Sequence, residues 1–594
     1  MKVSTSERVA QASLILTGLM FVVPFLQPYH SFPLTAFYSE WLAFALGLAA
    51  ALLLLQRAPW RDATLPAVSL VAPALALLLG LQVALGRVPY PEQALTATLY
   101  LLWAALLMLL AHVLRRELGM TAVATALAWF ALGGGLLGAL AGLLQHYQIS
   151  VPLEFMVTRK AAAGVYGNLG QANHYAAHVI LALGSAAYLH CRGSLRGAWA
   201  AACAVPLLFV LALSGSRSPW IYLTALAVLA FLLHSHRRGA DSFKLSAVVF
   251  WLLLGFIAAQ WVAGLPFLAP EQGAPVTSGQ RLFAEAAGIE ARLQLWHEAW
   301  RMFLAAPVLG AGFGQFAWHH FEFTAAGGAS AAPGAFNHAH NIVLQLMAET
   351  GGIGALAVVG AVLAWLADLR RARFDPERWW MLALLAVIGI HSLLEFPLWY
   401  AYFLGVTALL LGLGAERVFA LRYAAAARVT AALFLLVGGF NLVSVLPHYR
   451  EFERLVFAPE PRGAPPQGEK LFAEAIERLH REPLLTPYVE LAVAYGITGT
   501  DERLREKLEL NSRAMRFAPA DVVVFRQAQL LALAGEREAA LHRLDQAARV
   551  YPGQLPEVIK ELAKLAGQRP AEFAPLLKSA VAKNAEFRGR DAVR

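Results

Sequence analysis

Charged residues are scarce in this chain. Asp, Glu, Lys and Arg make up 15% of its 594 residues, whereas soluble proteins carry roughly 25%, and 58% of the residues are apolar. This composition excludes an ordinary cytosolic enzyme. Apolar runs of about 17–25 residues recur instead, and a helix of that length crosses a hydrocarbon core of about 30 Å. The sequence therefore predicts an all-α, polytopic membrane protein.

Cysteine is almost absent as well. The two cysteines, Cys191 and Cys203, lie at and inside apolar segments. Their spacing resembles neither a disulfide framework nor a zinc site. The chain also has no glycine-rich loop of the kind that cradles phosphate and no metal-binding carboxylate pair. We therefore expect neither a metal nor another cofactor.

Thirteen membrane spans are expected. They lie near residues 11–27, 37–56, 66–85, 94–114, 120–145, 171–190, 197–214, 219–235, 245–264, 341–366, 379–394, 398–414 and 429–446. An odd number of spans places the chain after about residue 450 on the opposite side of the membrane from the N-terminus.

Basic residues indicate which connections are cytoplasmic, because short cytoplasmic loops retain Lys and Arg. Six alternate connections carry Arg57 and Arg61; Arg115 and Arg116; Arg192 and Arg196; Arg237, Arg238 and Lys244; Arg370, Arg371 and Arg373; and Arg417 and Arg422. The opposite connections at 28–36 and 391–397 have none. The N-terminus is then cytoplasmic, the C-terminal region lies outside, and the net charge of +9 requires no nucleic-acid partner.

Four regions are expected along the chain. They are a transmembrane bundle at 1–264, an outer loop at 265–340, further transmembrane helices at 341–448 and a soluble helical domain at 449–594. In the loop, apolar residues at helical spacing, among them Trp296 and Trp300, predict a helix lying in the membrane interface. In the soluble domain, "FAP" and "VYP" lie 33 residues apart, close to the tetratricopeptide period of 34; a helical bundle without repeats is the alternative.

Two arginines on the outer side are candidates for binding an anion. Arg217 lies in "LSGSRSPWIY" between two apolar spans, where an arginine is costly unless something anionic pairs with it. Arg292 precedes Trp296 by one helical turn, so its guanidinium could bind a lipid phosphate with two parallel hydrogen bonds. The structural alternatives are an interfacial anchor for Arg217 and a solvated helix face for Arg292.

Three polar clusters complete the candidate site. Asn168, Gln171, Asn173 and His174 crowd the entry to one span, and helix capping accounts for one of these four groups. His338 and His340 precede another span, where a neutral imidazole near guanidiniums could accept a proton as a general base. His391, Glu395, Tyr400 and Tyr402 surround an outer turn at Pro397. The Glu395 carboxylate could orient or pair with a cation of the site, and a plain interfacial residue is the alternative.

These groups are expected on one membrane face, and together they suit glycosyl transfer from a lipid-borne diphosphate. The arginines would stabilise charge on the leaving diphosphate while the histidine deprotonates the acceptor. A transporter of lipid-linked glycans is the non-enzymatic alternative, although transporters tend to place their charges near the membrane midplane. A scaffold that presents the repeat domain would leave the polar clusters without a purpose.

Several motifs resemble a known family. "RSPW", "GAGFGQF", "HAHNIVLQLMAETGGIG" and "LLEFPLWYAY" are similar to the O-antigen ligase and polymerase superfamily, and "GNLGQANHYA" resembles its PglL-type O-linked protein oligosaccharyltransferases. Phe396 in "EFP" departs from members that have tyrosine there.

The resemblance implies a GT-C-like enzyme at the periplasmic face of the bacterial inner membrane. It would move a glycan en bloc from undecaprenyl diphosphate to Ser or Thr of pilin or other exported proteins. His340 matches the family's catalytic histidine, Arg217 and Arg292 its diphosphate-binding arginines, and Gln171 its amide motif. Close alternatives are ligation to lipid A-core and polymerisation of O-antigen, but the soluble tail favours a protein acceptor.

Overall fold

The computed structural model describes residues 5–55, 64–149, 154–160, 164–269, 277, 287–327, 336–421, 423–457, 474–497 and 503–591. Three of the basic residues used to predict topology, Arg57, Arg61 and Arg422, lie outside these ranges. So do residues 270–276, 278–286 and 328–335 of the expected loop. The described chain is divided into two compact units, and each unit is described by itself. Unit 1 contains residues 1–74, 99–285 and 357–443, and unit 2 contains residues 75–98, 286–356 and 444–594.

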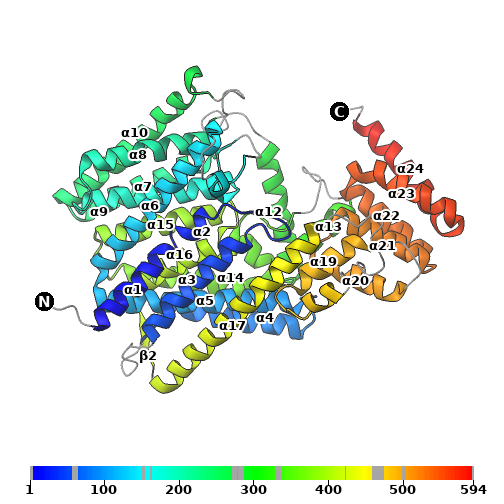
Figure 1. Cartoon of the computed structure of the whole chain (residues 1–594), viewed down its shortest axis with the longest axis horizontal. Coiled ribbons are helices and arrows are strands. Elements are labelled where there is room, and N and C mark those ends of the chain that lie inside the picture. The colour runs from blue at the N-terminus through cyan, green and yellow to red at the C-terminus, as the bar shows by residue number, and fades with distance from the viewer. Residues whose placement is uncertain are drawn as a thin grey trace. The chain divides into compact units, whose positions relative to one another are not determined.

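The described residues are almost entirely helical (Figure 1). The helices of the membrane part are α1 (Thr5–Leu19), α2 (Val23–Leu26), α3 (Phe37–Leu55), α4 (Val71–Ala84), α5 (Pro91–Leu118), α6 (Met120–Tyr147), α7 (Ala172–Cys191), α8 (Gly197–Leu213), α9 (Ser218–His236), α10 (Ala240–Ala263), α14 (Ile342–Leu369), α15 (Pro376–Ser392), α16 (Ala401–Leu413) and α17 (Ala424–Phe457). The strands found in the described ranges, β1 (Thr64–Pro66) and β2 (Val418–Ala420), pair antiparallel with Thr64 opposite Ala420.

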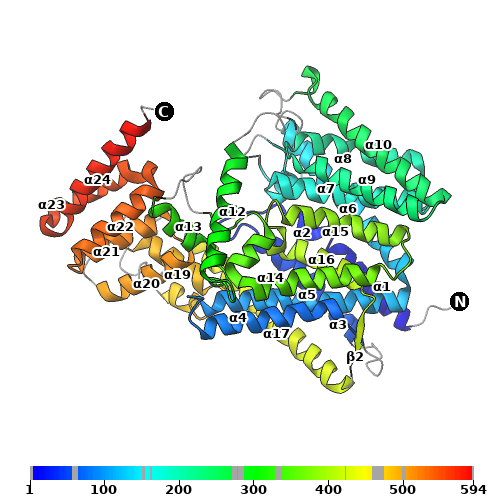
Figure 2. The same ribbon diagram turned by 180° about the vertical axis from the view of Figure 1, so that it is seen from behind.

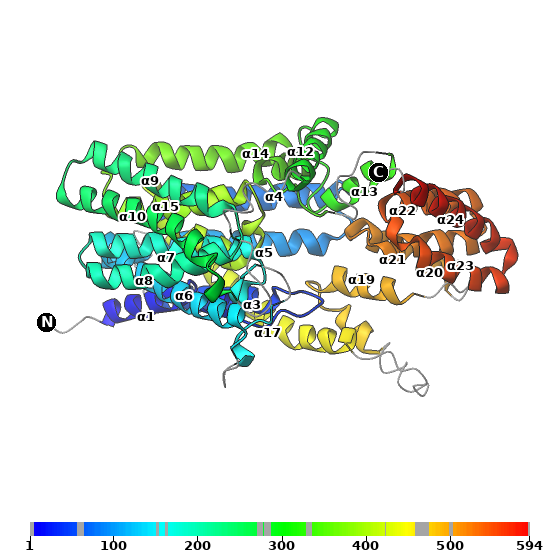
Figure 3. The same cartoon turned by 90° about the horizontal axis from the view of Figure 1, so that it is seen from above.

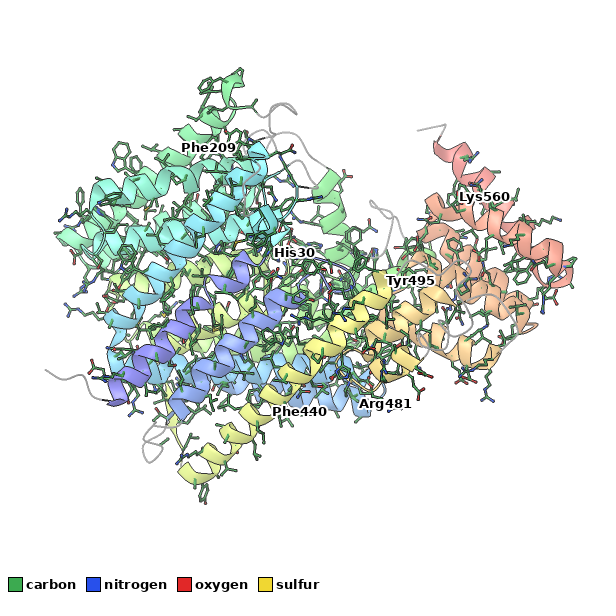
Figure 4. All side chains as sticks on the ribbon, in the orientation of Figure 1. His30, Phe209, Phe440, Arg481, Tyr495 and Lys560 are labelled. Carbon is green, nitrogen blue, oxygen red and sulfur yellow. The ribbon has the colours of Figure 1, made fainter. Side chains whose placement is uncertain are left out.

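Each of the thirteen expected spans falls on a helix. Among the described residues, eight helical segments are long and apolar enough to cross a membrane, and three shorter apolar helices cover Phe37–Leu53, Gly197–Leu213 and Ala401–Leu413. The polytopic all-α prediction is therefore confirmed, while the number of spans stays a prediction. Apolar side chains are exposed on α17, where Phe440 is 72% exposed (Figure 4).

The core of unit 1 is built around α7. This helix is buried along nearly its whole length, because α6, α8, α9, α10 and α15 all pack against it (Figure 2). A helix that is apolar on all sides belongs in such a central position. The first turn of α7 is the exception, since it carries the amide cluster of the candidate site.

Unit 2 joins the outer loop to the C-terminal helices. The latter are α19 (Thr486–Gly496), α20 (Leu504–Phe517), α21 (Asp521–Leu533), α22 (Arg537–Val550), α23 (Leu555–Gln568) and α24 (Pro570–Asp591), and each packs on the next or shares the same core (Figure 3). Helix α13 (Phe316–Ala325), from the expected loop, buries Phe321 in that core. The tetratricopeptide-like repeats in the C-terminal region stay a prediction. The division of the chain into the four regions expected from the sequence stays a prediction as well.

A second connection within unit 2 ties the segment before α5 to the C-terminal helices. The Tyr90 hydroxyl donates a hydrogen bond of 2.6 Å to Glu490, which also binds the Arg513 guanidinium through both of its oxygens. Burial and this carboxylate raise the pKa of Tyr90. The C-terminal helices are therefore fixed to other segments of unit 2 by buried polar contacts as well as by apolar packing.

Candidate active site

An amide and carboxylate cluster lies at the entry to α7 in unit 1. Asn173 Nδ2 donates a hydrogen bond of 2.7 Å to Glu395 Oε1, and Gln171 Nε2 lies 3.5 Å from Glu395 Oε2. Glu395 follows α15 and is only 4% exposed, and its backbone N–H donates to the His391 carbonyl at 2.8 Å. A buried carboxylate requires such donors. The structure thus brings Glu395 into contact with Gln171 and Asn173. These two residues precede Glu395 in the sequence by 224 and 222 residues.

Two buried imidazoles extend this cluster. His391 Nε2 lies 3.2 Å from His174 Nδ1, and His391 Nδ1 lies 3.0 Å from the Tyr222 hydroxyl. Tyr400 contacts the His174 ring edge to face, with centroids 5.0 Å apart, and stacks with Phe396 at 6.0 Å. The hydrogen-bonded row therefore joins α7, α9 and α15 inside the bundle. His174 and His391 were noted in the polar clusters of the sequence, whereas Tyr222 was not, because a single tyrosine in an apolar span carries no signal of its partner.

Asn168 has a bridging position. Its Nδ2 donates to the carbonyls of Leu26 at 2.7 Å and Met156 at 2.8 Å, and its Oδ1 accepts from the Thr158 N–H at 3.0 Å. The side chain is 5% exposed. These three bonds satisfy most of the hydrogen-bonding capacity of the amide. Asn168 therefore ties its own turn, which leads to Gln171, to Leu26 and to the segment of Met156 and Thr158.

Arg217 lies between α8 and α9 in a turn rich in serine. Its half-buried side chain belongs to the residue directly before α9, which begins with Ser218 and Pro219. Proline suits the first turn of a helix, since its missing N–H would have no intrahelical partner there. Gly215, with φ of 66°, supplies the left-handed backbone conformation that the turn requires.

The histidine motif lies in unit 2, directly before α14. Asn341 caps this helix, and its Oδ1 accepts hydrogen bonds from the N–H groups of Val343 at 3.1 Å and Leu344 at 3.2 Å. His338 and His340 are both half-buried, and His340 has a φ of 51°, a left-handed conformation that costs free energy outside glycine. Strained backbone of this kind clusters at functional sites.

Two contacts fix the chain between these histidines. The Ala339 N–H donates a hydrogen bond of 2.7 Å to Gln345 Oε1, so α14 itself holds the loop. The Ala339 side chain is fully buried with Leu295 and Ala299 of helix α12 (Ala287–Ala305). The loop of His340 therefore packs on the helix that carries Arg292.

Helix α12 presents two different faces. Leu295 and Ala299 are buried, whereas Leu293, Trp300 and Leu304 are between 44% and 59% exposed. Exposed apolar groups on one face suit a helix at a membrane interface. Arg292 is half-buried beside this face. The contact of Arg292 with a lipid phosphate stays a prediction.

The loop at residues 310–316 packs on α14, C-terminal to the histidine motif. In "GAGFGQF", the Ala311 N–H donates to the Ala348 carbonyl at 2.9 Å, and Gln82 Nε2 donates to the Leu309 and Glu349 carbonyls at 2.6 and 2.7 Å. Glu349 Oε1 accepts from the Phe316 N–H at 3.1 Å. Gln82 and Glu349 thus hold this loop against α14 within unit 2. Their contact was not predicted, because the two residues are far apart in the sequence.

The site residues fall into two sets, one in each unit. Gln171, Asn173, Glu395, Tyr400 and Arg217 belong to unit 1, and Arg292, His338 and His340 belong to unit 2. Within the described residues, no group of three or more His, Cys, Asp and Glu side chains has the arrangement of a metal site.

Comparison with known proteins extends these observations. The family model described as O-antigen ligase matches residues 202–359, and the model described as virulence factor membrane-bound polymerase, C-terminal, matches residues 379–564. The chain is 28% identical over 415 residues to the general O-oligosaccharyltransferase of Acinetobacter baylyi, covering 67% of this chain and 69% of that protein. It is 24% identical over 238 residues to the ComP-specific O-oligosaccharyltransferase of the same organism, covering 40% and 41%.

The helical membrane bundle and these similarities define the class of protein. The chain is a multi-pass membrane glycosyltransferase of the oligosaccharyltransferase and O-antigen ligase class. Within this class, the similarities confirm the resemblance of its motifs to PglL-type members of the O-antigen ligase superfamily.

Proposed function

We propose that this protein is an O-linked oligosaccharyltransferase. It moves a glycan en bloc from undecaprenyl diphosphate to Ser or Thr hydroxyls of pilin or other exported proteins, at the periplasmic face of the bacterial inner membrane. The observation that carries this proposal is the similarity, over two-thirds of the chain, to a general O-oligosaccharyltransferase. The polar clusters at the entries to α7 and α14 support it, because a scaffold or a lipid anchor would need neither.

Arg217 and Arg292 bind the donor diphosphate in this proposal. Both side chains are half-buried, so each can reach a ligand while keeping part of its length in protein. A guanidinium pairs with a phosphate through two parallel hydrogen bonds and stabilises the charge that grows on the leaving diphosphate. Gln171, His338 and Tyr400 complete the binding site for the diphosphate and its first sugars. Asn173, predicted as a fourth binding residue, instead positions Glu395 through its hydrogen bond.

His340 is the general base. It takes the proton of the acceptor hydroxyl while that oxygen attacks the anomeric carbon, and the bond from this carbon to the diphosphate breaks. The diphosphate leaves on its lipid with the bonding electrons. Glu395 and Asn168 are buried behind their hydrogen-bond partners, so they act by positioning other groups.

The arginines make a divalent cation unnecessary in this mechanism. We therefore expect that a chelator leaves glycan transfer by the purified enzyme unchanged, because guanidiniums neutralise the leaving group. Loss of transfer that Mg²⁺ or Mn²⁺ restores would contradict this mechanism.

The acceptor distinguishes this function from its relatives. The alternatives are an O-antigen ligase that uses lipid A-core, a polymerase that extends O-antigen, and a transporter of lipid-linked glycan. We would express the full chain in a host that makes a lipid-linked glycan but lacks its own ligase, together with a pilin. Glycan on pilin supports the proposal, glycan on lipopolysaccharide supports a ligase, longer lipid-linked chains support a polymerase, and an unchanged donor pool refutes transfer.

A further inference from the structure

The turn that carries Arg217 is held by its own serines. The Ser216 N–H donates to Ser214 Oγ at 3.2 Å, and Ser214 Oγ donates in turn to the Leu211 carbonyl at 2.7 Å. The Ser218 N–H lies 3.4 Å from Ser216 Oγ. Such local bonds of serine to backbone favour turns over helix. They fix the backbone on both sides of Arg217.

One of these serines also reaches the carboxylate cluster. Ser216 Oγ donates a hydrogen bond of 2.7 Å to Asn173 Oδ1, and Asn173 Nδ2 donates one of 2.7 Å to Glu395 Oε1. Ser216 and Glu395 are each 4% exposed. An ionised carboxylate only accepts, and an amide oxygen only accepts, so the three groups form one directed row from hydroxyl to carboxylate.

We propose that Ser216 is a positioning residue for the transfer reaction. Through Asn173, its hydroxyl ties the Arg217 turn to Glu395, and this connection sets the direction in which the Arg217 guanidinium meets the donor diphosphate. In this arrangement Asn173 is a connector between two segments, because both ends of its amide are bonded to protein. The inference rests on the proposed role of Arg217 in donor binding.

The affinity for the donor is the quantity that this connection controls. Replacing Ser216 with Ala removes the hydrogen bond from its hydroxyl to Asn173 Oδ1. The loss of one such bond corresponds to a rise of about 3- to 10-fold in KM for the lipid-linked donor, with a smaller change in kcat. A residue that only stabilised the fold would lower the amount of active enzyme and leave KM unchanged.

The test uses the full-length protein in detergent with purified lipid-linked oligosaccharide and an acceptor protein. KM for the donor is expected to rise in the order wild type, Ser216→Cys, Ser216→Ala, because a thiol is a weaker donor of similar size. Ser392→Ala is the matched control. Ser392 is also a buried serine, 2% exposed, but its hydroxyl bonds the Ile388 carbonyl of its own helix.

A second variant tests whether the row acts as one unit. Asn173→Leu has a side chain of similar size that can neither accept from Ser216 nor donate to Glu395. Because the links act in series, the double variant with Ser216→Ala should be no worse than Asn173→Leu alone. Effects on KM that multiply, or a Ser216→Ala enzyme with unchanged KM, would overturn the inference. If Arg217→Lys still raises KM in that case, the proposed function survives; a wild-type protein without transfer activity would remove both.

Discussion

At the scale of single residues, the motifs located the polar groups but not their partners. His340, Arg217 and Gln171 were found from their place at the mouths of apolar spans. The hydrogen-bond partner of Glu395 was not. Asn173, and Ser216 that bonds Asn173, come from segments about 220 and 180 residues before Glu395, and no spacing rule connects them. Asn168 was expected to bind substrate, and its three bonds to backbone favour a role in positioning.

The proposed base is the most direct residue to test. His340→Ala should fold and bind donor but lose transfer by about 100-fold or more, the usual contribution of a general base. The measurement is single-turnover transfer from lipid-linked oligosaccharide, with thermal unfolding as a check of the fold. His297→Ala, at an exposed histidine of α12, is the control and should retain activity. Normal turnover by His340→Ala would exclude it as the base.

The arginines test whether geometry or charge alone binds the donor. Arg217→Lys keeps the positive charge but cannot form two parallel bonds to a phosphate, so KM for the donor should rise by about 10-fold or more. Arg292→Lys should behave in the same way. Arg301→Lys is the control, because Arg301 stacks on the Phe323 ring, 4.6 Å from its centroid. An unchanged KM in Arg217→Lys would contradict diphosphate binding by this residue and favour the alternative, an interfacial anchor.

At the scale of elements, α14 is the helix whose form the sequence did not reveal. Its apolar run predicted one continuous span, but the backbone leaves the helical region at Gly351, with φ of 66°. The backbone of the preceding loop fills the break, and the Gly352 N–H donates to the Pro307 carbonyl at 2.8 Å. The pattern of apolar residues does not show such a break, because apolar residues continue on both sides of it.

This break gives a prediction about glycine. A Cβ at residue 351 would lie 2.3 Å from the Val308 oxygen, and the positive φ adds strain, so Gly351→Ala should lower the melting temperature and the transfer rate. Gly360→Ala, on the same helix with no atom within 4 Å of its Cβ, should be neutral or slightly stabilising. Equal melting temperatures for the two variants would show that the break is not required.

At the scale of the whole molecule, the distribution of basic residues predicts the orientation in the membrane. In a chain with Cys191 and Cys203 replaced by serine, a cysteine at the exposed position of Lys560 should react with a membrane-impermeant thiol reagent in intact spheroplasts. A cysteine at Arg371, whose side chain is 80% exposed, should react only after permeabilisation. The reverse pattern would overturn the predicted orientation, and with it the periplasmic site.

The sequence alone determined the class of fold, the helical segments and the family, because length, apolar content and short motifs are local properties of a chain. The tertiary structure decided which distant groups share a hydrogen bond. It bonded Asn173 to both Glu395 and Ser216, packed the His340 loop on α12, and joined α13 to the C-terminal core. These contacts depend on how helices pack side by side, and that packing is set by the shapes of many side chains together, which no single stretch of sequence contains.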